Sequence, residues 1–228
     1  MSDSVKVVPV VNVPNALTVL RLVMVPLFAW MLLSHPHDVT WRWMTTGVFI
    51  LALLTDLADG KIARKYGLIT DFGKLWDPIA DKAITGMAMI GLSILGELWW
   101  WVTIIILIRE WGITVMRFLI VKYGVQAADK LGKMKTFTQT IALVGLLAPF
   151  VLYMGDAAVT GAGYWTCVIL HWVAVVAMGI ALILTVVSGV NYCIGAWKLR
   201  RDWFAAHPAS LSAASTPQNG SGDAPNPV

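Results

Sequence analysis

Four aspartates stand close together in an otherwise apolar chain: Asp56 and Asp59 are three residues apart, and Asp77 and Asp81 are four residues apart. Carboxylates near hydrocarbon are energetically costly and persist mainly where they bind a ligand or take part in chemistry. No histidine or cysteine accompanies them, so oxygen-only coordination indicates Mg²⁺, Mn²⁺ or Ca²⁺ rather than zinc. Four shared carboxylates suit a site with two metal ions, of the kind that supports phosphoryl transfer.

The spacing of the aspartates places each pair on one face of a helix, since positions three or four apart lie on the same side. We expect the first pair near the end of one helix and the second pair at the start of the next. Asp77 precedes Pro78, which is typical of a helix cap followed by proline in the first turn. A helical hairpin would then bring the two pairs together.

Small residues and one arginine accompany the aspartates. Gly60, Ala63 and Gly73 leave room for a bulky ligand beside the metals, and Arg64 could hold a phosphate. The plainer interpretation is that Asp56 and Asp59 cap a helix or pair with the basic residues Lys61, Arg64 and Lys82.

A second charged group interrupts the fourth apolar segment and continues into the fifth: Arg109, Glu110, Arg117, Lys133 and Lys135. Charges this deep in an apolar helix should face the interior of a bundle. Glu110 can orient an arginine through a charge-assisted bond and leave guanidinium donors for a phosphate. The group therefore predicts an acceptor that itself carries a phosphate. Alternatively, the lysines serve membrane topology and Arg109 pairs structurally with Glu110.

The elements that position these residues are apolar helices. Of the 228 residues, 58% are hydrophobic and 13% are charged, which indicates an all-α, polytopic membrane protein. A spanning helix needs about 20 mostly apolar residues. Six transmembrane helices are predicted, at residues 16–34, 41–60, 78–96, 99–122, 134–154 and 165–197. The first is expected to begin at Pro14, with Asn15 as its cap.

The distribution of basic residues predicts the orientation. Lysines and arginines gather in the second and fourth connections and after the last helix, whereas the first, third and fifth connections hold only Arg42. The N- and C-termini are therefore expected in the cytoplasm. The net charge of +4 then reflects topology and contact with the lipid bilayer rather than nucleic acid.

Three parts of the chain are expected. Residues 1–11 form an N-terminal lead, residues 12–204 the membrane domain, and residues 205–228 a disordered C-terminal tail rich in Ala, Ser, Pro and Gly. The lead lacks a basic start followed by a short apolar stretch, so we expect no cleaved signal peptide.

The pattern D-x2-D-G-x2-A-R-x8-G-x3-D-x3-D is matched at every fixed position between Asp56 and Asp81. On this pattern the chain resembles the CDP-alcohol phosphatidyltransferase family, over about residues 12–200. The resemblance implies a six-helix membrane fold, a homodimer, and a cavity open to the cytoplasm and the bilayer. It implies that Asp56, Asp59, Asp77 and Asp81 bind metal, that Asp81 is also the general base, and that the CDP site is lined by Asp59, Gly60, Ala63, Arg64 and Gly73.

Three further segments, residues 12–21, 109–117 and 132–136, are similar to those of bacterial family members that use glycerol 3-phosphate as acceptor. This similarity implies CDP-diacylglycerol as donor and a place in the bacterial cytoplasmic membrane, with the active site facing the cytoplasm. The acceptor phosphate would be bound by Arg109, Arg117, Lys135 and Arg21.

The hypothesis is that two Mg²⁺ or Mn²⁺ ions hold the pyrophosphate of the donor, and that the primary hydroxyl of glycerol 3-phosphate attacks the phosphorus bearing diacylglycerol. Within the family, the alternative acceptors are phosphatidylglycerol, as in cardiolipin synthesis, and inositol phosphate. A more distant alternative is a divalent-cation transporter. Transporters often show internal repeats and midplane sites, whereas these acids are expected at the cytoplasmic edge of the membrane and no repeat is visible.

Overall fold

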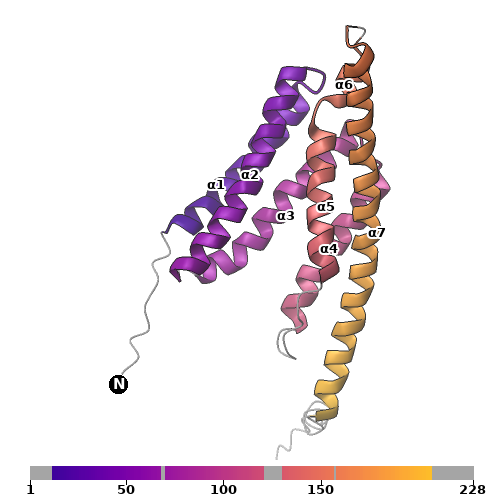
Figure 1. Cartoon of the computed structure of the whole chain (residues 1–228). Coiled ribbons are helices and arrows are strands. Elements are labelled where there is room, and N and C mark those ends of the chain that lie inside the picture. The colour runs from indigo at the N-terminus through magenta and orange to yellow at the C-terminus, as the bar shows by residue number, and fades with distance from the viewer. Residues whose placement is uncertain (1–11, 68–69, 121–129, 157, 207–228) are drawn as a thin grey trace, which may run out of the picture.

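The computed structural model describes residues 12–67, 70–120, 130–156 and 158–206, and all the secondary structure in these ranges is helical (Figure 1). The helices are α1 (Val13–Ser34), α2 (Val39–Tyr66), α3 (Asp71–Ile94), α4 (Trp100–Ile120), α5 (Lys130–Leu147), α6 (Phe150–Met154) and α7 (Gly161–Ala206). The all-α fold class is therefore confirmed. The start of α1, the end of α2 and the end of α7 lie toward the same end of the bundle, the lower one in Figure 1.

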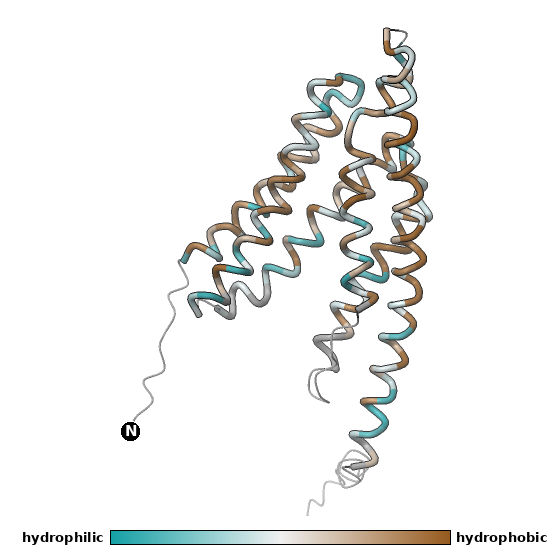
Figure 2. The backbone as a smooth tube through the Cα atoms, viewed as in Figure 1, coloured by the Kyte–Doolittle hydropathy of each residue, from teal (hydrophilic) through white to brown (hydrophobic). Residues whose placement is uncertain are grey.

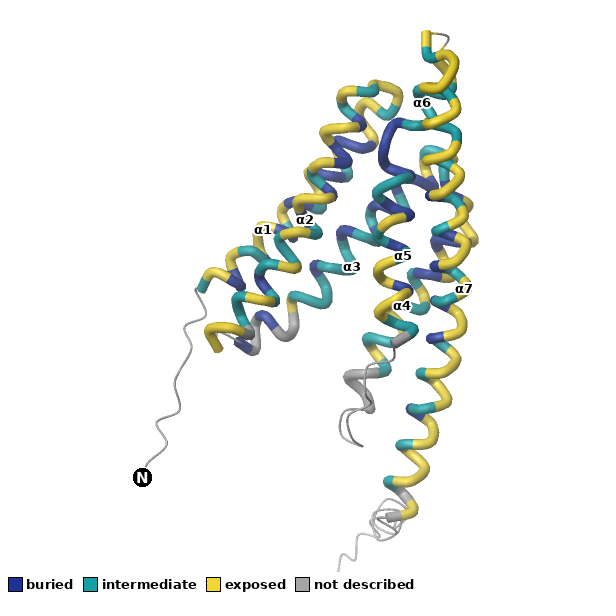
Figure 3. Tube along the Cα trace, in the orientation of Figure 1, coloured by how far each residue is buried: buried dark blue, intermediate teal, exposed yellow. Residues whose placement is uncertain are grey.

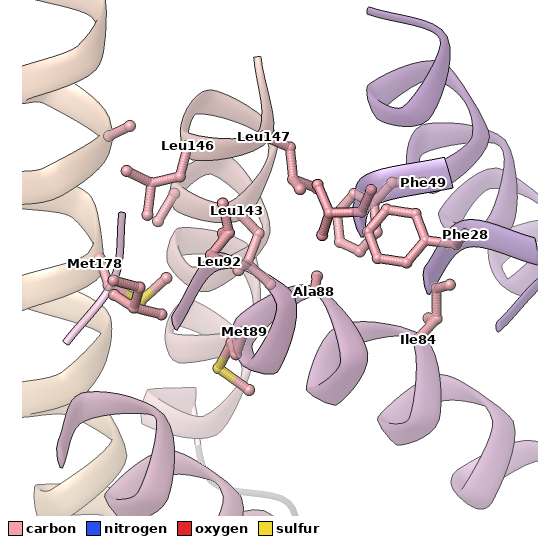
Figure 4. Packing of buried hydrophobic residues seen from close by; sticks show 14 of the residues in the cluster. Phe28, Phe49, Ile84, Ala88, Met89, Leu92, Leu143, Leu146, Leu147 and Met178 are labelled. Carbon is pink, nitrogen blue, oxygen red and sulfur yellow. The ribbon is translucent and has the colours of Figure 1, made fainter. Parts of the chain in front are cut away.

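The buried apolar core is centred on α3, which lies between α1 and α2 on one side and α5 and α7 on the other (Figure 4). On the first side, the rings of Phe28 and Phe49 have centroids 5.7 Å apart and lie near Ile84. On the second side, Leu92 lies beside Leu143. In an apolar surrounding such helices are held by van der Waals contacts. The helix that carries the second aspartate pair is thus packed from both sides.

Among the described residues, two helices, α1 and α7, are long and apolar enough to cross a membrane by length and composition alone. On α7 only 17% of the most apolar stretch is buried within the protein. Figure 2 shows apolar residues along this helix, and Figure 3 shows how much of it is exposed. Exposed apolar surface of this extent is typical of contact with lipid or another protein. The number of spans and their orientation stay predictions.

The fifth predicted segment, residues 134–154, is not one helix, and this expectation was wrong. The structure divides it into α5 and α6 at Ala148 and Pro149. Proline has no backbone N–H to donate within a helix, and it disfavours the helical conformation of the residue before it. Leu147, the last residue of α5, is followed by a change of direction (Figure 1).

The cap of α1 is Asn12 rather than the predicted Asn15. The Oδ1 atom of Asn12 accepts a hydrogen bond from the backbone N–H of Asn15 at 2.9 Å. Pro14 fits the first turn, because the N–H that it lacks has no partner within the helix there. Asn15 lies in the first turn of the helix and is buried.

The connection between α2 and α3 also differs from the prediction. α2 ends at Tyr66 and is capped by Gly67, whose φ of 64° is left-handed and suits glycine. α3 then begins directly after Thr70, whose Oγ1 accepts a hydrogen bond from the N–H of Gly73 at 3.1 Å. Asp77 is therefore not a cap, and Pro78 lies inside α3. The second aspartate pair is carried within a helix that starts earlier than predicted.

Candidate functional site

A polar stripe on α1 faces the aspartates. Asn15, Thr18 and Arg21 are spaced three residues apart, and all three side chains are buried. Buried polar groups need hydrogen-bond partners, and in this stripe the partners come from α2, α3 and the connection between them. The aspartates are therefore held by a helix that lies far from them in sequence.

Arg21 joins the first aspartate pair. Its NH1 atom lies 2.5 Å from Oδ1 of Asp56, and its NH2 atom lies 2.5 Å from Oδ2 of Asp59. The Arg21 side chain is fully buried, with 0% exposure. A guanidinium presents a rigid fork of donors, so it fixes the orientation of both carboxylates. Arg21 was predicted to bind an acceptor phosphate, but its charged group points at Asp56 and Asp59.

Thr18 and Asn15 reach toward α3. Thr18 Oγ1 donates to Oδ1 of Asp77 at 2.5 Å, and Oδ1 of Asn15 accepts from the hydroxyl of Thr70 at 2.9 Å. Gly73 lies beneath these groups: a Cβ atom added there would come within 3.1 Å of Asn15 Oδ1 and 3.5 Å of Asp77 Oδ2. Glycine at this position therefore permits the close approach of α1 and α3.

The four aspartates are brought near one another by this packing. Asp56 interacts electrostatically with both Asp77 and Asp81. Within the described residues, no group of three or more His, Cys, Asp or Glu side chains is arranged to hold a metal ion. The donor chemistry nevertheless fits a hard divalent cation, because every donor is a carboxylate oxygen. The single charge of Arg21 also compensates only part of the negative charge of Asp56, Asp59 and Asp77.

The remaining residues predicted for the nucleotide lie on α2. Gly60 and Ala63 are half-buried there. The side chain of Arg64 lies outside the part of the chain that the structure describes, and so does that of Arg117 on α4.

A second cluster surrounds Glu110 of α4. Lys135 contacts Oε1 of Glu110, Arg109 NH1 lies 3.6 Å from the same oxygen, and Lys82 Nζ lies 4.0 Å from Oε2. Lys82 Nζ also donates to the backbone carbonyl of Glu110 at 2.8 Å, and Arg109 NH2 donates to Ser188 Oγ of α7 at 2.7 Å. Three cations around one carboxylate leave an excess of positive charge that suits an anion such as phosphate.

Lys82 and Ser188 were not predicted as site residues. Lys82 directly follows Asp81 in sequence, so its position could have indicated a role beside the second aspartate pair. Ser188 gave no such signal, since only the packing of α7 against α4 brings it to Arg109.

One cavity of about 830 Å³ joins the two clusters. Its volume lies within the range of small-molecule sites. Both predicted groups contribute to it, together with Gln139 and residues of α7; the charged residues in its wall are Asp56, Asp81, Lys82, Arg109, Glu110, Lys133 and Lys135. The cavity thus has acids on one side and an excess of cations on the other.

The chain is similar to known proteins over most of its length. The sequence profile of the CDP-alcohol phosphatidyltransferase family matches residues 11–187. A protein of Mycobacterium tuberculosis described as a probable phosphatidylglycerophosphate synthase is 45% identical over 184 residues, which cover 80% of each chain.

Two further relatives carry the name CDP-diacylglycerol–glycerol-3-phosphate 3-phosphatidyltransferase. The one from Bacillus subtilis is 34% identical over 204 residues, covering 82% of this chain and 96% of the relative. The one from Rickettsia typhi is 36% identical over 183 residues, covering 79% and 94%. The matched region therefore includes the four aspartates and the cations around Glu110.

Proposed function

The chain belongs to the CDP-alcohol phosphatidyltransferase family, and on this premise we propose that it transfers the phosphatidyl group of CDP-diacylglycerol to glycerol 3-phosphate. The products are phosphatidylglycerophosphate and CMP, and the reaction belongs to phospholipid biosynthesis. The observation that carries the proposal is that Asp56 and Asp81 line the same cavity as a cluster of three cations. Such a cavity suits a reaction between a pyrophosphate held by metal ions and an acceptor that carries a phosphate.

In this proposal two Mg²⁺ or Mn²⁺ ions are held by the four aspartates: Asp56, Asp59, Asp77 and Asp81. When bound, such ions polarise phosphoryl oxygens and neutralise charge that develops on them. Arg21 and Thr18 have a supporting role. Arg21 donates to one carboxylate oxygen of Asp56 and one of Asp59, and Thr18 donates to one of Asp77. These bonds restrict how the carboxylates can turn. Groups that orient metal ligands in this way commonly change metal affinity by about 10–100-fold.

The donor nucleotide is proposed to lie along α2 and the start of α3, against Asp59, Gly60, Ala63, Arg64 and Gly73. The small side chains of Gly60 and Ala63 support this placement, because they leave a half-buried surface beside Asp59. Gly73 contributes through packing: its missing side chain lets α1 approach and orient Asp77.

The acceptor phosphate is proposed to bind Arg109, Lys135 and Lys82, with Arg117 as a further ligand. The primary hydroxyl of glycerol 3-phosphate then gives its proton to Asp81. Its oxygen forms a bond to the phosphorus that carries diacylglycerol, the bond from that phosphorus to the CMP oxygen breaks, and CMP leaves with the electron pair. Fixing the phosphate in the cation cluster positions the hydroxyl, and such positioning can supply a large part of a rate enhancement.

Residues 12–204 are proposed to form one membrane domain with six spans and both termini in the cytoplasm. The exposed apolar surface of α7 and the positions of the basic residues support this arrangement. The active site would face the cytoplasm at a bacterial cytoplasmic membrane, where the donor's acyl chains stay in the bilayer. A homodimer is also proposed, and the mass of the detergent-solubilised protein tests it.

The test uses purified full-length protein in detergent with CDP-diacylglycerol and one acceptor at a time: glycerol 3-phosphate, phosphatidylglycerol or inositol phosphate. Of the three acceptors, we expect only glycerol 3-phosphate to give CMP and phosphatidylglycerophosphate, which are identified by mass. Chelation by EDTA should abolish both, and Mg²⁺ or Mn²⁺ should restore them. A phospholipid product with another acceptor would reassign the acceptor. Absence of CMP with every acceptor would contradict the transferase, and metal uptake by liposomes would then support a transporter.

A further inference from the structure

Gln139 of α5 is a buried polar side chain that the mechanism above does not use. It lines the cavity and is 5% exposed. Its carbonyl oxygen Oε1 has no hydrogen-bond partner among the described residues, and its Nε2 atom lies 3.7 Å from Sδ of Met89, a weak acceptor. A buried polar atom without a partner costs about 1–3 kcal/mol. An acceptor atom kept at this cost beside a cavity indicates a ligand that donates to it.

The direction of α5 points this amide into the site. Gln139 is four residues after Lys135, so both lie on the same face of the helix. Long side chains on a helix lean toward its N-terminus, which places the Gln139 amide over the turn that carries Lys135. Lys135 in turn contacts Glu110 and interacts electrostatically with Asp81. The amide is therefore next to the space between the cation cluster and Asp81.

Three hydroxyl side chains in the cavity wall, those of Thr85, Thr114 and Ser188, have hydrogen-bond partners. The hydroxyls of Thr85 and Thr114 donate to carbonyls one turn earlier, at 3.0 and 2.9 Å. Ser188 donates to the carbonyl of Thr185 at 3.3 Å and accepts from Arg109. Gln139 differs from them because its oxygen accepts from no described group.

We propose that Gln139 accepts a hydrogen bond from the secondary hydroxyl of glycerol 3-phosphate and so determines which phosphorylated alcohol is used. The inference rests on the proposed function. That acceptor presents three polar groups: its phosphate binds the cations, its primary hydroxyl faces Asp81, and its secondary hydroxyl lies between them. A site built to hydrogen-bond a hydroxyl discriminates strongly against an analogue that lacks it, because the site's own polar group is then left unpaired.

The test compares glycerol 3-phosphate with 3-hydroxypropyl phosphate, which has the same phosphate and primary hydroxyl but no secondary hydroxyl. We expect the wild-type protein to prefer glycerol 3-phosphate in kcat/KM by about 10–100-fold, the range for one hydrogen bond to a buried group. In Gln139→Leu and Gln139→Met this preference should fall to within about threefold of unity. The loss should come from glycerol 3-phosphate, while turnover of the analogue is retained. Both variants should unfold at or above the wild-type temperature, since they remove an unsatisfied buried group.

The matched control is Thr140→Val, which changes the next residue of α5 in the same cavity wall and should keep the wild-type preference. The inference is overturned if Gln139→Leu or Gln139→Met keeps the preference, or if both acceptors lose turnover equally. It is also overturned, without any variant, if the wild-type protein uses both acceptors equally well. A wild-type protein that releases CMP with neither acceptor overturns the proposed function as well, so the two failures are distinct.

Discussion

The two ends of the helix bundle both contain buried charges, but they balance them differently. At the end away from the aspartates, the fully buried Arg42 donates to both oxygens of Glu97, at 2.9 and 2.7 Å. The same guanidinium donates to the backbone carbonyls of Leu146 and Leu147, each at 3.2 Å. These carbonyls end α5, where they lack partners within the helix. One cation and one anion are thus matched and tied to the backbone.

At the other end, the charges are not matched within each cluster. Arg21 is shared between two carboxylates, whereas Glu110 is shared among three cations. Burying unmatched charge is costly unless a partner compensates it. The matched pair joins helices, whereas the unmatched clusters are suited to ligands of opposite charge, namely metal ions on one side and a phosphate on the other.

Among the substitutions considered, one in the aspartate cluster should change kcat most. Asp81→Asn should lower kcat for CMP release by about 1,000-fold, within the range for removal of a general base. Its unfolding temperature should not fall, because the change removes one of several like charges. Steady-state kinetics and thermal unfolding in detergent check both parts. Glu97→Gln, the amide substitution at the matched end, serves as the control and should keep kcat within about threefold. Full turnover by Asp81→Asn would remove the base assignment.

The next effect concerns the matched end and should appear in stability instead of kcat. Arg42→Met leaves the half-buried Glu97 and the carbonyls of Leu146 and Leu147 without this partner, so we expect a loss of about 3 kcal/mol in the free energy of unfolding. The turnover of the folded fraction at low temperature should stay near that of the wild type. The double variant Arg42→Met/Glu97→Leu should recover much of the loss. An unchanged unfolding temperature in Arg42→Met would show that the ion pair does not hold these helices together.

The smallest effect is expected in the cation cluster and concerns binding of the acceptor. Lys135→Met should raise KM for glycerol 3-phosphate by about 30-fold, because one hydrogen bond to a charged group contributes about 2 kcal/mol. KM for CDP-diacylglycerol should change little. Lys133→Met is the matched control: Lys133 also lines the cavity but is exposed, so water screens its charge and its effect should be smaller. Equal effects of the two substitutions would contradict a specific contact with Lys135.

Several features could be predicted from sequence because they depend on local patterns. Apolar runs of about 20 residues predicted the positions of the long helices. The spacing of the aspartates predicted that each pair lies on one face of a helix. The charges near Glu110 predicted a polar cluster in the bundle. The predicted start of α3 at Asp77 was wrong, because Thr70 supplies a cap about two turns earlier, and proline also occurs inside helices. The break at Pro149 follows from a local rule that a hydropathy pattern does not contain.

The sequence therefore determined the family, the helices and the chemical character of both clusters, since these follow from residue type and from spacing along the chain. Only the tertiary structure decided which charges meet. Arg21 lies 35 residues before Asp56 and 38 before Asp59, yet pairs with both. Lys82 reaches Glu110, and the amide of Gln139 comes to border the same cavity. Contacts between helices depend on how each helix is rotated and packed, and no periodicity within one helix specifies the rotation of its neighbour.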